Sequence, residues 1–399
     1  MKRILIVSHA MEIGGAEKAL LGLLETIDTT KYEVDLFLLR HRGELLKEIP
    51  DTINLLPEIP EYTDLAVPIS EVLKKRHFKI AFARYRAKKA AKNRVKKLRL
   101  GKNDIALEYS HKYTAKYMPD ISNVEYDVAI SFLTPHYFVA EKTKAKKKIA
   151  WIHTDYSTVS VDKASQLSMW NSYNSIVSIS KTASKAFCSV FPELENKVTV
   201  IQNILPINYI SRISRSVDVF DDMPNDGAIK LLSIGRFCVA KNFDNIPKIC
   251  CNIKKQGLNV KWYIIGFGAD EMLIRERIHE SGMDDSVIII GKKTNPYPYI
   301  KNCDIYVQPS RFEGRCVSVT EAQLFAKPVI ITDYPTAKCQ LEDGVDGIIV
   351  PLDNDMCAQG IVDVINNSKV MNQLTKNCLL RDYSSKSEIF KLYALISDK

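Results

Sequence analysis

Short apolar runs alternate with longer amphipathic stretches along most of the chain. The apolar runs predict buried strands at 2–8, 32–39, 126–132, 148–153, 175–180 and 198–201, and a second series at 229–234, 260–266, 287–290, 304–308 and 328–332. The stretches between them, such as 16–27, have the period and length of helices. Strands that alternate with helices are typical of doubly wound parallel sheets, so the predicted fold class is α/β.

A polar, turn-rich stretch at 207–228 separates the two series of strands. The chain of 399 residues also exceeds what one hydrophobic core usually supports. We therefore expect two Rossmann-like domains facing a cleft, at 1–206 and 229–380, with 207–228 as the linker and 381–399 as a helical tail. Ligands of open parallel sheets bind at the carboxyl ends of the strands, so functional residues are expected in the loops that follow them.

The cysteines and the first residues of the chain indicate the cellular compartment of the protein. The nine cysteines lie largely within apolar runs and include no C-x-x-C pair, which favours buried, reduced thiols over a disulfide or zinc framework. The first residues enter a strand pattern directly, and no apolar run approaches the length of a membrane span, so neither a signal peptide nor a span is expected. These features predict a cytoplasmic protein.

One segment supplies the whole net charge of +9. Fourteen Lys and Arg residues lie within 74–102, and the rest of the chain carries 42 basic against 47 acidic residues. Apolar side chains lie among these charges, at Phe78, Ile80, Phe82, Tyr85, Val95 and Leu98. The pattern predicts an insertion of one or two amphipathic helices that bind the anionic inner face of the cell membrane, with Lys88 and Lys89 among the contacts.

Two other roles of the basic segment stay open. It could be a solvated helical hairpin, or it could bind nucleic acid. Its aromatic residues do not form the interleaved stacking platform expected of single-strand binders, so nucleic acid is disfavoured. Peripheral association with the membrane is the favoured prediction.

Two carboxylates stand eight positions apart where a predicted strand gives way to a predicted helix. Glu313 falls in the loop after 304–308, and Glu321 in the first turns of the helix that follows. A lone glutamate at a helix start more often interacts with the helix dipole, but the spacing and the flanking Pro309 and Gly314 favour a ligand site. Carboxylates only accept hydrogen bonds, so the pair suits the hydroxyls of a sugar and a ribose.

This two-glutamate segment, followed by Lys327-Pro328-Val329-Ile330 and Asp333, resembles the corresponding part of retaining glycosyltransferases of family 4. Other landmarks occur in the family's order: the first glycine loop at 8–17, the phosphate-binding loop at 233–237 with Lys241, and the strand end Ile265-Gly266-Phe267-Gly268. The resemblance implies the fold called glycosyltransferase-B, with a tail that crosses back to the first domain. It also implies sugar transfer from a nucleoside diphosphate.

The resemblance implies roles for the residues that match. The expected nucleotide-sugar-binding set is Gly14, Gly15, Arg236, Lys241, Gly266, Lys293, Glu313, Gly314, Arg315, Cys316, Val317 and Glu321. Glu313 is expected at the hydroxyls of the donor sugar and Glu321 at the ribose. Arg315 and Cys316 stand where relatives often have small or apolar residues, which leaves the donor sugar open.

The leaving diphosphate needs its charge stabilised, either by a metal or by fixed cations and backbone amides. Arg236 and Lys241 follow a predicted strand, and the helix after Gly15 begins with free amides. No D-x-D motif lies in a plausible strand-end loop, since the acidic run at 218–222 falls in the predicted linker. We therefore expect a reaction without a metal and without a cofactor. The resemblance favours a UDP-sugar as the donor substrate, and the residues themselves leave uridine and guanosine open.

Two histidines close predicted strands. His153 ends the strand 148–153 and His9 follows 2–8. A histidine there is usually structural, but the resemblance places one near the reacting carbon, so His153 and Glu313 are the expected catalytic residues. His9 is a candidate acceptor contact. No spacing indicates a covalent nucleophile.

These residues and the resemblance together predict a retaining glycosyltransferase that transfers a hexose or N-acetylhexosamine from a UDP-sugar to a glycan acceptor. The expected acceptor is lipid-linked, and the expected pathway is surface polysaccharide biosynthesis. A nucleotide-sugar epimerase or a hydrolase on the same scaffold is the alternative. An NAD-dependent oxidoreductase is disfavoured because neither glycine cluster has the G-x-G-x-x-G spacing. A binding protein or silent subunit is disfavoured by the complete set of candidate residues.

Overall fold

The computed structural model describes residues 1–98, 105–314 and 316–397. The chain divides into two compact units, Met1–Ile207 with Ser385–Lys399, and Asn208–Ser384. Each unit has its own hydrophobic core around its own parallel sheet. The predicted fold class is therefore confirmed: two α/β units with doubly wound parallel sheets.

The sheet of the first unit has seven parallel strands in the order β3-β2-β1-β4-β5-β6-β7. They are β1 (Lys2–Ser8), β2 (Tyr32–Leu38), β3 (Asn54–Leu55), β4 (Glu125–Ser131), β5 (Lys144–Ile152), β6 (Ser175–Ser178) and β7 (Val198–Val200). Two differences from the sequence prediction stand out. The edge strand β3 is too short to form an apolar run, and β5 begins four residues earlier than predicted because its first half is lysine-rich and only partly buried.

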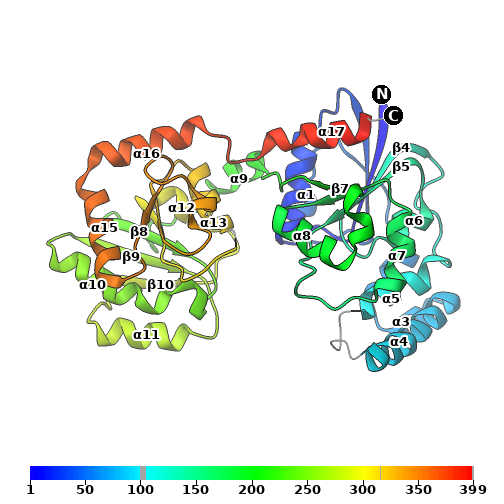
Figure 1. Cartoon of the computed structure of the whole chain (residues 1–399), viewed down its shortest axis with the longest axis horizontal. Coiled ribbons are helices and arrows are strands. Elements are labelled where there is room, and N and C mark those ends of the chain that lie inside the picture. The colour runs from blue at the N-terminus through cyan, green and yellow to red at the C-terminus, as the bar shows by residue number, and fades with distance from the viewer. Residues whose placement is uncertain (99–104, 315, 398–399) are drawn as a thin grey trace. The chain divides into compact units, whose positions relative to one another are not determined.

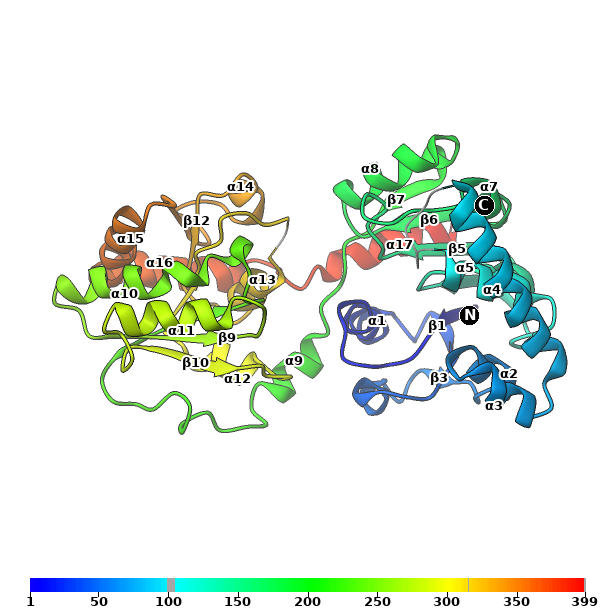
Figure 2. The same cartoon turned by 90° about the horizontal axis from the view of Figure 1, so that it is seen from below.

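Helices cover both faces of this sheet (Figures 1 and 2). They are α1 (Gly15–Thr26), α2 (Pro60–Thr63), α3 (Ile69–Lys74), α4 (Phe78–Leu98), α5 (Ala106–Ala115), α6 (Tyr137–Lys142), α7 (Lys163–Asn171), α8 (Lys181–Val190) and α17 (Ile389–Ser397). The last of these, red in Figure 1, belongs to the C-terminal tail. Its Tyr393 ring stacks on Tyr32 at 4.9 Å, and the Lys2 ammonium donates to the Ile396 carbonyl at 3.0 Å. The tail therefore packs on the first unit.

The sheet of the second unit has six parallel strands in the order β10-β9-β8-β11-β12-β13. They are β8 (Ile229–Ile234), β9 (Val260–Ile265), β10 (Val287–Gly291), β11 (Ile305–Gln308), β12 (Val329–Thr332) and β13 (Ile348–Val350). Its helices are α9 (Ile207–Ile213), α10 (Ile246–Lys255), α11 (Glu271–Glu280), α12 (Tyr297–Asn302), α13 (Val317–Leu324), α14 (Ala337–Gln340), α15 (Asn354–Asn366) and α16 (Ser368–Leu380). The stretch expected as a linker, 207–228, opens with α9 and from Asn208 onward belongs to this unit.

The basic segment begins at the last residue of α3, and its residues 78–98 form α4, which lies along α5 (Figure 2). Its last residues, 99–102, lie outside the described residues. Small side chains on one face of α4, such as Ala87 and Ala91, pack against Ile105 and Tyr109. The opposite face exposes Phe78, Phe82 and Tyr85, together with Lys88 and Lys89. In the described parts of the chain, no helix is both long and apolar enough to cross a membrane.

Candidate functional site

The two glutamates lie at the carboxyl end of β11, in the elements that the sequence predicted. Glu313 is in the loop between β11 and α13, and Glu321 is in the second turn of α13. Glu313 is half-buried, whereas Glu321 is only 6% exposed. The β8, β9 and β10 loops lie at the same edge of the sheet, because all strands of this unit run parallel.

Glu313 is held by contacts from three segments. Its Oε1 atom accepts hydrogen bonds from the Lys241 ammonium at 2.5 Å and from the Ser310 hydroxyl at 2.6 Å. The Thr336 hydroxyl donates to its backbone carbonyl at 2.6 Å. Oε2 makes no hydrogen bond with the described residues, so one carboxylate oxygen stays available for a ligand.

Lys241 connects this carboxylate to the loop after β8. Burial lowers the pKa of its ammonium, but the adjacent Cys316 and Glu313 outweigh that effect, and the pKa is raised overall. Lys241 therefore carries its charge at physiological pH. The Cys316 thiol, 3.7 Å from the Lys241 ammonium, is buried, and burial raises its pKa, so it is neutral.

The glycines after β8 and β9 allow two loops to lie against each other. A Cβ atom on Gly266 would be 1.9 Å from the Gly235 carbonyl oxygen, and one on Gly268 would be 2.2 Å from the Phe237 carbonyl oxygen. The loops are joined by hydrogen bonds from the Gly235 amide to Ile265 and from the Phe237 amide to Phe267. Gly266 therefore has a packing role whether or not it also approaches a ligand.

Other predicted residues of the second unit have different surroundings. Glu321 accepts a hydrogen bond from the Tyr297 hydroxyl at 2.8 Å. Lys293, after β10, pairs with Asp222 at 2.8 Å and lies over the Tyr299 ring. The hydrogen bond to Asp222 raises the pKa of Lys293, so this lysine is charged but already has an acidic partner.

Three more predicted residues of this unit, Arg236, Gly314 and Val317, are exposed. Arg236 makes no ion pair or hydrogen bond with the described residues. Arg315 lies outside the described residues.

In the first unit, the predicted residues lie at the ends of β1 and β5. Gly14 precedes α1, and Gly15 is its first residue, with open space where a Cβ atom would stand. Burial lowers the pKa of both His9 and His153 to about 4, so both rings are neutral at physiological pH. The Nε2 atom of His153 is buried without a partner in the described part of the chain.

Two further buried histidines, which were not predicted from the sequence, lie near these strand ends. His111 lies in α5 with its ring centroid 5.7 Å from that of His9, and His136 follows β4. Each has one ring nitrogen that is buried without a partner in the described chain. The signal that could have pointed to His136 was its place four residues beyond the end of the predicted strand 126–132.

Part of the second unit matches a known protein family. Residues 216–379 match the family model of glycosyl transferases group 1. This segment contains Arg236, Lys241, Lys293 and both glutamates. We refer to 216–379 as the group 1 segment.

Relatives by sequence are glycosyltransferases matched over part of their length. An amylovoran biosynthesis glycosyltransferase, AmsD of Erwinia amylovora, is 29% identical over 149 residues, which cover 37% of this chain and 41% of that protein. The N-acetylgalactosamine-N,N'-diacetylbacillosaminyl-diphospho-undecaprenol 4-alpha-N-acetylgalactosaminyltransferase of Campylobacter jejuni is 28% identical over 144 residues, 35% of this chain and 38% of its own. The matches thus span about two fifths of these relatives.

Solved structures resemble the whole chain, beyond the group 1 segment. TarM of S. aureus has a TM-score of 0.62 at 14% identity and covers 100% of this chain and 99% of its own. HepE of Anabaena, solved with UDP and glucose, has a TM-score of 0.58 at 16% identity and covers 100% of both chains. At such low identity the likeness concerns the fold, which is that of glycosyltransferase-B.

Proposed function

We propose that this protein is a retaining glycosyltransferase that transfers a hexose or N-acetylhexosamine from a UDP-sugar to a glycan acceptor in surface polysaccharide biosynthesis. The observation that carries the proposal is the ion pair between Glu313 and Lys241, fixed at the carboxyl ends of β8 and β11 within the group 1 segment. The Glu313 carboxylate, which can accept hydrogen bonds from sugar hydroxyl groups, lies there next to the Lys241 ammonium, which can bind phosphate. A nucleoside diphosphate sugar carries both chemical groups.

The leaving diphosphate is bound by cations and backbone amides in this proposal. Lys241 is held in place by Glu313, and Arg236 is exposed in the same loop, the one after β8, without an internal partner in the described chain. Charge-assisted hydrogen bonds to phosphate from such groups are roughly twice as strong as neutral ones. The two residues therefore stabilise negative charge without a metal ion.

The two glutamates bind the hydroxyl groups. Glu313 offers its unengaged Oε2 to the donor sugar, and Glu321, fixed by Tyr297, is assigned to the ribose. The exposed Gly314 and Val317 and the buried Cys316 complete this loop. Lys293 contacts the base only after partial release from Asp222, so it contributes least among the assigned residues.

In the first unit, Gly14 and Gly15 present the amides at the start of α1 to the donor. His153 is neutral and lines the face of the donor sugar, and His9 contacts the acceptor. Retention follows if the acceptor oxygen bonds to the anomeric carbon on the face from which the diphosphate leaves. The carbon–oxygen bond to the diphosphate breaks as the new bond forms, and the acceptor's proton passes to the departing phosphate oxygen.

We further propose a lipid-linked acceptor at the inner face of the cell membrane. The exposed aromatic residues of α4, with Lys88 and Lys89, favour an anionic lipid surface. The name of the Campylobacter relative describes a substrate linked to diphospho-undecaprenol. This supports the same class of acceptor here.

Thermal melting in EDTA with UDP, GDP, ADP, NAD and UDP-sugars tests the donor. A nucleotide at about 100 times its dissociation constant adds roughly 2.7 kcal/mol of stability, which raises the melting temperature by several degrees. We expect a rise with UDP or a UDP-sugar that the Glu321→Ala variant loses. A rise with NAD alone would contradict the proposal, and consumption of a UDP-sugar without any acceptor would favour a hydrolase or epimerase.

A further inference from the structure

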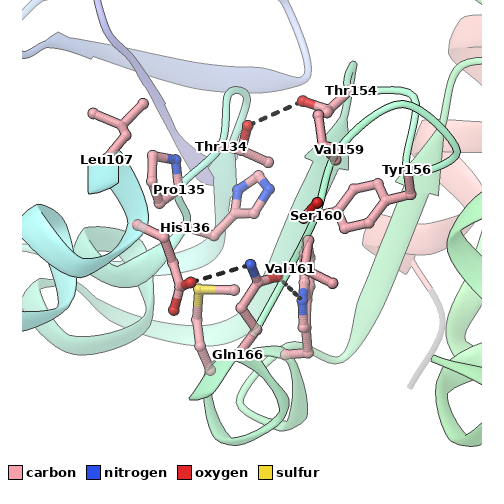
Figure 3. Close-up of a pocket in the computed structure, with 13 residues that line it drawn as sticks. Leu107, Thr134, Pro135, His136, Thr154, Tyr156, Val159, Ser160, Val161 and Gln166 are labelled. Carbon is pink, nitrogen blue, oxygen red and sulfur yellow. Dashed lines mark hydrogen bonds between the residues drawn. The ribbon is translucent and has the colours of Figure 1, made fainter. Parts of the chain in front are cut away.

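A cavity of about 170 Å³ lies within the first unit, behind the loops that follow β4 and β5 (Figure 3). Its wall comes from those two loops, from α7 and from the start of α5. None of the residues assigned above to donor or acceptor lines it. The cavity is thus a separate feature of the unit that carries His9 and His153.

His136 lines this cavity, and one of its ring nitrogens has no partner among the described residues. The residue is 0% exposed, and its Nδ1 atom is 2.8 Å from the Ser131 hydroxyl. Its Nε2 atom is buried and has no partner in the described chain. Leaving a buried polar group unpaired is unfavourable, so a bound molecule with a hydroxyl that pairs with Nε2 would relieve that cost. Burial lowers the pKa of His136 to about 3, which keeps the ring neutral.

Three more polar groups of the wall have spare hydrogen-bonding capacity. The hydroxyls of Thr134 and Thr154 lie 3.3 Å apart, as Figure 3 shows. Glu108 accepts short bonds from Tyr137 and Ser165 at its Oε1 atom, but its Oε2 atom has only a 3.4 Å contact with Gln166. These groups can both donate to and accept from hydroxyls of a ligand.

The charge and shape of the cavity restrict its occupant. No Lys or Arg lines it, and Glu108 disfavours an anion, so neither a diphosphate nor an acidic sugar fits. Buried Trp170 and Tyr156 give it an apolar wall. Its volume is more than ten times the roughly 10–15 Å³ that one water needs, yet below the ~300–1,000 Å³ of pockets for drug-sized ligands. A single neutral ring with hydroxyl groups meets these conditions.

We propose that this cavity binds one neutral sugar ring of the glycan acceptor, with His136, the Thr134–Thr154 hydroxyl pair and Glu108 as its hydrogen-bonding partners. The assignment to the acceptor rests on the glycosyltransferase function proposed above. It specifies a neutral hexose or N-acetylhexosamine as the acceptor ring bound in this cavity, and it excludes a uronic acid at this position.

Saturation-transfer NMR on the full chain tests the inference with the methyl glycosides of glucose, galactose, N-acetylglucosamine and N-acetylgalactosamine, and with methyl glucuronide as the charged probe. We expect binding of at least one neutral glycoside and none of the glucuronide. His136→Gln should weaken that binding roughly 3- to 10-fold, the value of one neutral hydrogen bond. Val159→Trp, which fills the cavity, should abolish it.

His111→Gln is the matched control, because His111 is also buried with an unpaired ring nitrogen but does not line the cavity. It should bind the glycoside as the wild type does. No neutral glycoside binding by the wild type, binding unchanged in both cavity variants, or equal binding of the glucuronide would overturn the inference. Melting with UDP on the same samples separates the two proposals: glycoside binding without a UDP response would refute the donor assignment alone.

Discussion

At the scale of single residues, the ion pair between Lys241 and Glu313 joins positions 72 apart in the chain. Lys241→Ala would remove a cation from the expected diphosphate site, and charged hydrogen bonds contribute about 1.5–3 kcal/mol each. We expect the dissociation constant for UDP to rise roughly 10- to 100-fold by calorimetry. Lys261, at the amino end of β9, pairs with Asp226 and is the control. If Lys261→Ala weakened UDP binding as much, Lys241 would have no special role.

Burial lowers the pKa of four histidines in the first unit, His9, His111, His136 and His153, and makes the stability of that unit depend on pH. Burial lowers the pKa of His9 and His153 to about 4 and that of His136 to about 3, below the ordinary value of 6.5. Between pH 6.5 and 4 the unfolded chain binds protons that the folded chain does not. The free energy of unfolding is therefore highest above pH 6.5 and decreases as the pH is lowered from 6.5 to 4. Each group contributes a slope of up to about 1.4 kcal/mol per pH unit. Urea unfolding at pH 7.5 and at pH 5 measures how much the free energy of unfolding decreases between these two pH values. We expect a smaller decrease for His136→Gln than for the wild type, and the same decrease as the wild type for His279→Gln, whose side chain is exposed.

At the scale of elements, α4 has two faces with different partners. Its alanine face packs on α5, and its other face leaves Phe78, Phe82 and Tyr85 57–61% exposed. Changing these three to Ser should leave folding intact but lower sedimentation with anionic vesicles. Replacing both Lys88 and Lys89 by Glu should lower the affinity for anionic vesicles at least tenfold, because each basic residue near such a surface contributes about 1 kcal/mol.

Phe390 is the matched control for the aromatic residues of α4, because it is 70% exposed on α17. Phe390→Ser should sediment with anionic vesicles as the wild type does. Equal sedimentation of the wild type with neutral and anionic vesicles would refute the membrane proposal. Binding to single-stranded nucleic acid in its place would revive the alternative role of the basic segment.

At the scale of the whole molecule, the tail completes the core of the first unit. The backbone amide of Asp28 donates to the Tyr393 hydroxyl at 2.7 Å, and Leu392 is fully buried. Leu392→Ala should cost about 2–5 kcal/mol and lower the melting temperature of this unit by several degrees in calorimetry. Phe390→Ala, two positions earlier in the same helix, should change it little. An equal effect of both substitutions would mean that the tail is not packed as described.

Most elements were predictable because buried parallel strands are apolar along their whole length. The exceptions were strands that lack that signal, such as the two-residue β3 and the lysine-rich start of β5. Within the proposed donor site, Glu313 and Lys241 were both predicted from local motifs, and the structure shows that they are in contact. Asp222 beside Lys293 was not, because nothing local in the sequence indicates a partner 71 positions away.

The sequence by itself determined the α/β class, the two series of strands and the loops that carry the glutamates, because each depends on hydrophobic period and local spacing. Only the tertiary structure decided which of those residues meet. It paired Lys241 with Glu313, packed the tail on the first unit, and brought the α5 and α7 residues Glu108, Gln166 and Trp170 around His136. These outcomes depend on long-range packing of buried side chains. They could not be predicted from the sequence, because a local pattern does not indicate which distant segments pack in the same core.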